Sequence, residues 1–402
     1  MSRLFKLAAI SLPATLAAAL VLAAGVEVWT RARWDPLKGM PGFFLSDPVR
    51  IQRLAPGYHG WFAGVPVQIN QLGFRDDREY ALEKSPRTFR VLVLGDSVTF
   101  GHGSVYEHSY PRLLEDHLRA WRPEVEWQVW NLGVPGYNTS QELAHLLEVG
   151  PAFQPDLVIV GFFENDFVGN FPVVPAGILA RIRSGILSSL YRHAYSIELY
   201  KRLYLQAAWR LSGESSYRQR IDHLGEERQL IAPRRDIQDR DAQRLTPVDR
   251  LDDRAVAAIR CPNIPQQGPD LVDAIRREAG WDAWTANVRR LQTLNRDGVY
   301  AVSFFVQVAP ATCPSQDVFV DGGTAALNQF YLTMMGEGAP AVSPYEAFRH
   351  TRPSQMPDAG GHSLGNANAV KAEVLFAHLR DVVLPGLTQP RARSVLSSSP
   401  MQ

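Results

Sequence analysis

Cysteine is scarce in this chain, and its charges nearly cancel. Among 402 residues only Cys261 and Cys313 are cysteines, too few for a disulfide framework or a four-thiolate metal site. Lys and Arg total 42 against 41 Asp and Glu, so the formal charge of +1 gives no electrostatic reason to expect nucleic-acid binding. The hydrophobic content of 46% excludes a wholly disordered or collagen-like chain.

The sequence motifs of metal and dinucleotide sites are also missing. The 10 histidines include no His-x-His pair and no His-Glu-x-x-His helix. Gly101-His-Gly103 is too short to cradle a dinucleotide. We therefore expect a protein that uses neither a metal nor another cofactor.

One long apolar run stands near the N-terminus. Residues 7–26 are uncharged, and as a helix they rise about 30 Å, the thickness of a bilayer's hydrocarbon core. Basic and aromatic residues flank the run, namely Arg3, Lys6, Trp29, Arg31, Arg33 and Trp34. The run exceeds the roughly 7–15 apolar residues of a signal peptide, which favours a single uncleaved span over residues 1–30. A cleaved secretory signal is the alternative.

Either reading of the apolar run places the rest of the chain outside the cytoplasm. The start of an N-terminal span usually stays in the cytoplasm, so the main domain is expected to be periplasmic or otherwise extracytoplasmic. In an oxidising compartment Cys261 and Cys313 either pair or remain as two buried thiols.

Short apolar runs alternate with helical patterns from residue 86 onward. The expected strands are 89–97, 127–133, 156–163 and 300–308, and the expected helices are 109–121, 140–149, 284–296 and 366–382. This alternation predicts an α/β fold with a central parallel sheet covered by helices on both faces. The ligand site of such a fold lies at the carboxyl ends of the strands.

The remaining segments define the domain organisation. Residues 31–85 read as a linker and packing arm, 86–390 as the main domain, and 391–402 as a disordered tail. Within 201–260, 23 of 60 residues are charged, so the stretch of about 168–260 is expected to be a helical, charged insertion. A lid, a helical face resting on a membrane and a solvated decoration all remain open for it.

The residues at the predicted strand ends suggest nucleophilic catalysis. Ser97 follows the first buried strand at a strand-to-helix turn, where a hydroxyl can project into a cleft. A serine needs a base, and His362 lies in a glycine-rich loop just before the last helix. Asp358 is close enough in sequence to orient that imidazole. Gly133, Gly136 and Asn165 offer oxyanion donors; the loss of one such donor typically costs about 2.7–4 kcal/mol.

Four segments together resemble the blocks of the SGNH (GDSL-type) hydrolase superfamily. They are GDSVTFG (95–101), NLGVPGYN (131–138), FFEND (162–166) and DAGGH (358–362). The lead-in INQLGFRDD (69–77) is similar to membrane-anchored bacterial members. The resemblance implies a flavodoxin-like three-layer α/β/α fold, with Ser97 as nucleophile and His362 as base. It also implies an oxyanion hole formed by the N–H groups of Ser97 and Gly136 and by the side chain of Asn165.

One position departs from the pattern of the superfamily. Two residues usually separate the acid from the histidine, whereas three separate Asp358 from His362. Either the two intervening glycines absorb the extra residue and Asp358 completes the triad, or a backbone carbonyl orients His362 instead. The sequence leaves both arrangements open.

Three functions are compatible with these residues. The first is a membrane-tethered serine esterase that removes acyl groups, in particular acetyl groups, from a carbohydrate or lipid-linked substrate outside the cytoplasm. The second is an O-acyltransferase on the same scaffold. The third is a non-catalytic member that binds a glycan or a partner in polysaccharide assembly. The presence of Ser97, Asn165 and His362 favours an enzyme.

Overall fold

A five-stranded parallel sheet forms the centre of the computed structural model, which describes residues 3–34, 41–214, 218, 233–242, 248–261 and 270–387. In spatial order the strands are β11 (Ala341–Val342), β8 (Val302–Val306), β7 (Leu157–Phe162), β5 (Thr88–Gly95) and β6 (Glu126–Gly133). The four strands expected from the sequence are confirmed. The edge strand β11 was not expected, because two residues are too few to form a pattern.

Helices cover both faces of the sheet, as the three-layer expectation requires. One face carries α3 (Tyr110–Trp121) and α14 (Gly365–His378), and the other carries α4 (Thr139–Phe153), α11 (Trp281–Arg296) and α12 (Thr324–Gly336). Successive residues of β5 alternate between the two cores: Val91 and Val93 pack toward α3 and α14, and Leu92 packs toward α4 and α11. After α14 the chain continues through a π-helical turn, η5 (Leu379–Val383), into α15 (Leu384–Leu387).

Two antiparallel hairpins occupy the described part of the segment before β5. They pair β1 (Phe44–Asp47) with β2 (Ile51–Leu54), and β3 (His59–Phe62) with β4 (Val65–Gln68). Their apolar side chains form a separate core with residues of the main domain, including Phe100 and Leu364. The arm therefore packs against the end of β5, where the expected site lies.

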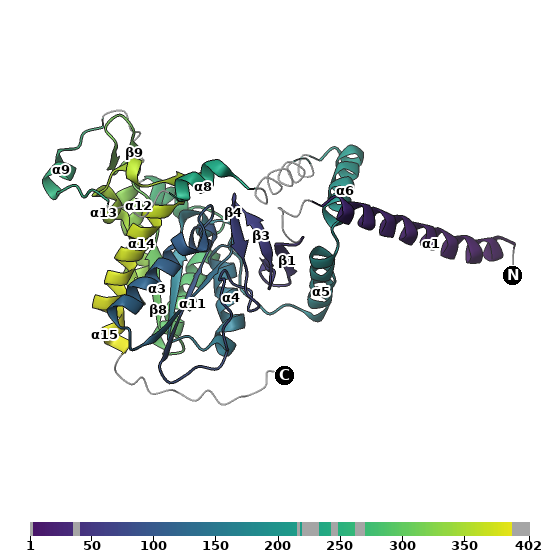
Figure 1. Cartoon of the computed structure of the whole chain (residues 1–402), viewed down its shortest axis with the longest axis horizontal. Helices are drawn as coiled ribbons and strands as arrows, with labels where there is room; N and C mark the ends of the chain where they lie inside the picture. The colour runs from purple at the N-terminus through teal and green to yellow at the C-terminus, as the bar shows by residue number, and fades with distance from the viewer. Residues whose placement is uncertain are drawn as a thin grey trace.

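A long helical excursion separates β7 from β8. Before α11, its helices among the described residues are α5 (Ile178–His193), α6 (Ile197–Ser212), α8 (Arg235–Asp241), α9 (Asp253–Ala258) and α10 (Asp270–Arg276). The first four lie in the stretch that the sequence marks as an insertion. In Figure 1 α5 and α6 lie at the inner end of α1 (Arg3–Ala32), whereas α9 lies on the opposite side of the molecule. The expected tail, 391–402, lies outside the described residues.

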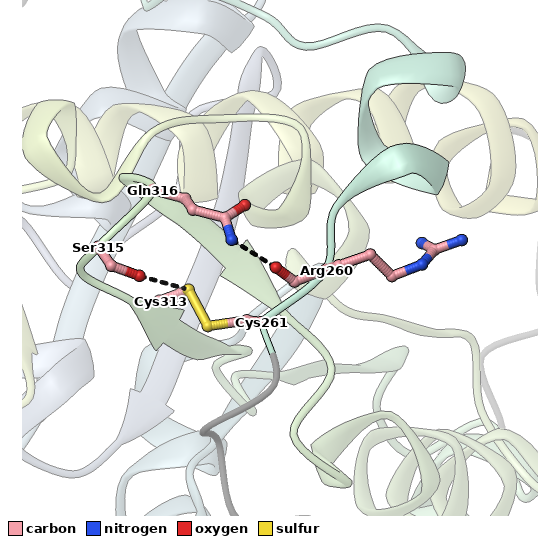
Figure 2. The surroundings of a disulfide bond; sticks show 5 residues. All are labelled: Arg260, Cys261, Cys313, Ser315 and Gln316. Carbon is pink, nitrogen blue, oxygen red and sulfur yellow. Dashed lines mark hydrogen bonds between the residues drawn. A yellow bond between two sulfur atoms is a disulfide. The ribbon is translucent and has the colours of Figure 1, made fainter.

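A disulfide joins the insertion to the main domain. Cys261, which follows α9, is bonded to Cys313 at the end of β9 (Ala311–Cys313), with a Cα–Cα distance of 6.3 Å (Figure 2). Beside it the Gln316 side chain donates to the Arg260 carbonyl. Of the two states that the sequence left open for the cysteines, the structure has the paired one.

Candidate active site

Ser97 stands at the first residue of a very short helix. The strand β5 ends at Gly95, and α2 (Ser97–Phe100) begins after a single residue, Asp96. The Asp96 Oδ1 atom accepts a hydrogen bond from the Val98 N–H at 2.8 Å, which caps the helix. The nucleophile block thus makes the strand-to-helix turn that the sequence predicts.

A row of glycines allows α2 to sit directly on the ends of three strands. Gly95 pairs with Gly133 of β6 on one side and with Gly161 of β7 on the other. A Cβ atom on Gly133 would lie 2.3 Å from the Phe100 nitrogen, and one on Gly161 would lie 2.4 Å from Thr99 Oγ1. Any side chain at these two positions would displace the helix, so the glycines fix the height of Ser97 above the sheet.

His362 reaches Ser97 from a segment 265 residues away in the chain. Its Nε2 atom lies 2.8 Å from Ser97 Oγ, and its Nδ1 atom donates to the Ala359 carbonyl oxygen at 3.2 Å. With the hydrogen on Nδ1, Nε2 is free to accept the seryl proton. Burial lowers the pKa of His362 below its ordinary 6.5, so the imidazole is neutral at pH 7.

The structure corrects the expectation that Asp358 orients His362. The strands β12 (Asp358–Ala359) and β13 (His362–Ser363) form a hairpin whose register pairs Ala359 with His362 and Asp358 with Ser363. Because side chains alternate across a strand, Asp358 projects from the opposite face of the hairpin. Its carboxylate is exposed and accepts a hydrogen bond from the Gly361 N–H at 3.3 Å. The backbone alternative that the sequence left open is the one observed.

The two glycines of this hairpin explain its register. Gly360 and Gly361 have φ angles of 62° and 85°, the conformation of a two-residue type I′ turn. Such a turn places the residues on either side of the Gly-Gly pair directly opposite each other. It therefore brings the Ala359 carbonyl, and not the Asp358 carboxylate, to the imidazole.

The three expected oxyanion donors follow neighbouring strands at the same sheet edge. Gly136 lies in the loop after β6, where Gln52 Nε2 donates to the Pro135 carbonyl at 2.9 Å. Asn165 lies in the 3₁₀ turn η3 (Glu164–Phe167) after β7, and its side chain hydrogen-bonds to the Asp96 carboxylate. The structure thus places Gly136 and Asn165 just after the two strands that flank β5, the strand that leads to Ser97.

His102, in the loop after α2, also belongs to the site. Its ring stacks on that of His362, with a centroid separation of 4.1 Å and an interplanar angle of 19°. Phe62 of the β3 hairpin packs edge-on against the same ring at 5.4 Å. Burial lowers the pKa of His102 to about 3, so it stacks as a neutral ring. In the sequence, the short spacing between Ser97 and His102 is the signal that places His102 in the site.

Arg75 supports the loop that carries His102. This fully buried guanidinium donates to the carbonyls of Phe100 and Gly101, both at 2.7 Å, and to that of Ser104 at 2.5 Å. Arg75 belongs to the lead-in segment 69–77, whose role in the site the sequence did not show. The arm therefore holds the active-site loop from behind.

A helix of the insertion ties the two catalytic segments together. Asp241, at the end of α8, accepts hydrogen bonds from the Val105 N–H at 2.8 Å and from the Gly365 N–H at 3.3 Å. From the same helix, Arg240 Nη1 donates to the Asp358 carbonyl at 2.9 Å. Because α8 contacts both the loop after Ser97 and the hairpin of His362, part of the insertion is structural support for the site.

Asp96 and Lys371 are two buried ionisable groups that act on His362. Asp96 is wholly buried, and its Oδ2 atom lies 3.2 Å from Ser97 Oγ. Burial lowers the pKa of Lys371, on α14, to about 7, and the charge of Asp96 opposes that shift. The charge of Asp96 also raises the pKa of His362 against the effect of burial. Among the described residues no cluster of three or more His, Cys, Asp or Glu side chains is placed to hold a metal.

A parallel sheet with a serine–imidazole pair at its carboxyl edge defines the chain as a hydrolase of the α/β class. The model of the GDSL-like lipase/acylhydrolase family matches residues 93–362. The chain belongs to that family, and it is a hydrolase that acts on ester bonds. The superfamily resemblance seen in the sequence is confirmed.

The proteins similar to this chain include esterases. An arylesterase of Vibrio mimicus is 36% identical over 83 residues, which are 21% of this chain and 40% of that protein. An α/β hydrolase, LAE5, from the metagenome of Lake Arreo is 13% identical with a TM-score of 0.34, over 72% of this chain and 94% of that one. An acetylxylan esterase of Geobacillus stearothermophilus is 14% identical with a TM-score of 0.34, over 73% of this chain and 93% of that one.

Proposed function

We propose that this chain is a membrane-tethered serine esterase that removes acyl groups, in particular acetyl groups, from a carbohydrate or lipid-linked alcohol outside the cytoplasm. The observation that carries the chemistry is the 2.8 Å contact between Ser97 Oγ and His362 Nε2. A serine with a neutral imidazole at hydrogen-bond distance is the minimal arrangement for acyl transfer.

The reaction follows from the geometry of this pair. Ser97 Oγ attacks the ester carbonyl while its proton passes to His362 Nε2. The negative charge on the carbonyl oxygen is stabilised by the N–H groups of Ser97 and Gly136 and by the Asn165 amide. The imidazolium then gives its proton to the departing alcohol. Water, deprotonated by the same nitrogen, releases the acid from the acyl-enzyme and restores Ser97.

The imidazolium of this enzyme lacks a directly bonded carboxylate. The Ala359 carbonyl accepts the Nδ1 hydrogen and fixes the tautomer, but it carries no full charge. The negative charge of Asp96 raises the pKa of His362 and so favours the protonated ring. We therefore assign Asp96 the electrostatic role that the acid of a triad performs elsewhere.

Three features support the membrane tether and the compartment. One helix in the described part of the chain, over Pro13–Ala32, is long and apolar enough to cross a bilayer, and it is not buried against the rest of the protein. The end of α1 is integrated in the fold: Glu27 accepts hydrogen bonds from the N–H groups of Tyr195 and Ser196 at 3.0 and 2.9 Å. A cleaved signal would lose these contacts. The disulfide favours an oxidising compartment.

The test is covalent trapping of the nucleophile in the full-length protein, purified in detergent. A fluorophosphonate should add to Ser97, as mass spectrometry of the labelled peptide would show, and the protein should hydrolyse p-nitrophenyl acetate. Ser97→Ala should lose both properties. A folded protein that neither hydrolyses the ester nor reacts with the phosphonate would contradict the proposal. A panel of acetylated sugars then tests the substrate class by release of acetate.

A further inference from the structure

The helices α5 and α6 leave apolar side chains exposed along one side. On α5 these residues are Ile178, Leu179, Ile182, Ile186 and Leu190. Four of the five recur every fourth residue, which places them on one face of the helix. On α6 the exposed apolar residues are Tyr200, Leu203, Tyr204 and Leu211, whereas Leu205 is buried. We call the exposed set the α5–α6 stripe.

The opposite face of α5 packs on the domain. Ser184 and Ser188 are buried there. The Ser184 hydroxyl donates to the hydroxyl of Ser46 in β1 at 3.2 Å, and the Ser188 hydroxyl donates to the Ser46 carbonyl at 2.7 Å. On a helical wheel these two serines lie roughly opposite Ile182 and Ile186, at 100° per residue. The apolar face of α5 therefore points away from the protein, and the stripe residues of α6 are exposed as well.

The position of α1 indicates what covers the stripe. Arg31 donates to the carbonyl of His193, and Glu27 accepts from Tyr195 and Ser196, so the end of α1 is held at the junction of α5 and α6. Both helices run across the axis of α1 at its inner end (Figure 1). If α1 stands along the bilayer normal, α5 and α6 lie parallel to the membrane surface.

The charge of this segment fits an anionic surface. Residues 178–212 contain six Lys and Arg residues but a single acidic residue, Glu198, in a chain whose net charge is +1. The basic residues are Arg181, Arg183, Arg192, Lys201, Arg202 and Arg210. On α5, Arg181 and Arg183 are exposed and flank the apolar face on its two sides. An apolar face bordered by arginines is typical of a helix that lies in the headgroup region.

We propose that the α5–α6 stripe inserts into the leaflet from which α1 emerges, with anionic lipid headgroups bound by the flanking arginines. This inference rests on the proposed membrane span of α1. The span of α1 and the inserted stripe would attach the domain to the bilayer in two directions and so fix its orientation. A single helix joined through a linker would leave the domain free to rotate.

A continuous set of contacts would fix the position of the active site relative to the membrane-bound helices. Ser188 of α5 is bonded to β1, β1 pairs with β2, and Gln52 of β2 donates to the carbonyl of Pro135 beside Gly136. Tyr137 also donates to the Gln52 carbonyl at 2.7 Å. The loop that holds a proposed oxyanion donor is thus set at a fixed distance from the bilayer surface, as suits an enzyme whose substrate is carried by a membrane.

The experiment measures the depth of single fluorophores in vesicles. The full chain is reconstituted in phosphatidylcholine vesicles with phosphatidylglycerol, and single cysteines are introduced as Ile182→Cys, Leu20→Cys and Val382→Cys. These side chains are 55%, 62% and 56% exposed, and Cys261 and Cys313 are bonded to each other, so a thiol probe reports the new site. Val382 lies in η5, which leads directly into α15, and Figure 1 shows α15 on the side of the domain away from α1. Quenching by nitroxide-labelled lipids is then compared.

The three sites separate the two proposals. We expect strong quenching at positions 20 and 182 and none at 382, with the quenching at 182 falling when phosphatidylglycerol is omitted. Quenching at 20 without quenching at 182 would overturn the inference and leave the membrane span intact. Absence of quenching at 20 would contradict the span itself. Cross-linking of position 182 between two copies, without lipid quenching, would assign the stripe to a second copy and also overturn the inference.

Discussion

Replacing Asp358 with asparagine is expected to leave most of the activity intact. The carboxylate is exposed, and it accepts a hydrogen bond from the Gly361 N–H at 3.3 Å. A hydrogen bond to a charged group contributes about 1.5–3 kcal/mol and one to a neutral group about 0.5–1.5 kcal/mol, and asparagine keeps a neutral acceptor oxygen at this position. The substitution therefore removes about 1–1.5 kcal/mol, and even if all of this were lost in the transition state kcat would fall by about tenfold, since 1.36 kcal/mol corresponds to one factor of ten. Loss of the acid of a working triad lowers kcat by about 10⁴.

The assay compares kcat for p-nitrophenyl acetate in three variants of the full-length protein. Asp358→Asn is set against His362→Ala, for which loss of the general base should lower kcat by about 10²–10⁴. Asp381→Asn, at an exposed carboxylate of η5, gives the baseline for removing a surface charge. A fall of 10³ or more for Asp358→Asn, with an unchanged melting temperature, would show that Asp358 reaches the imidazole during turnover and would refute the hairpin argument.

Three further predictions follow from the same contacts. Because burial lowers the pKa of His362 and the neutral ring is the active form, kcat/KM should rise with pH through an inflection below 6.5, and an inflection above 7 would contradict this. His102→Ala should admit water to the His362 ring and move the inflection to higher pH, whereas His102→Phe should keep the stacking and leave the inflection in place. Equal pH profiles for the two variants would show that the stacking does not affect the pKa of His362. Reduction of the Cys261–Cys313 bond, which spans 52 residues, should lower the free energy of unfolding by about 4 kcal/mol. Denaturant titration would measure that loss.

The sequence predicts the main sheet well because its strands are buried on both faces. Continuous apolar runs such as 89–94 have few alternative structures, and polar residues at the ends of such runs necessarily meet at one edge of a parallel sheet. For that reason Ser97 and Asn165 were found without any knowledge of distances. The two hairpins over 44–68 were missed as strands, since each strand has four residues and its pairing depends on turns and on contacts with Phe100.

The orientation of His362 was underdetermined for a different reason. Residue spacing alone does not distinguish a loop that returns the Asp358 carboxylate from a hairpin that presents a backbone carbonyl. A Gly-Gly pair between two short segments is a known hairpin signal, and applied to residues 358–363 it gives the observed register. His102 and Arg75 needed tertiary packing, because their contacts join the arm, the loop after Ser97 and the histidine hairpin.

The central claim is that Ser97 and His362 act as one unit on the acyl group. A double-mutant cycle measures this directly, with kcat/KM determined for Ser97→Ala, His362→Ala and the double variant. Two groups that serve one step give a double variant no slower than the slower single variant, and this is the predicted result. Losses that multiply in the double variant would show that the two residues act independently and would contradict the account.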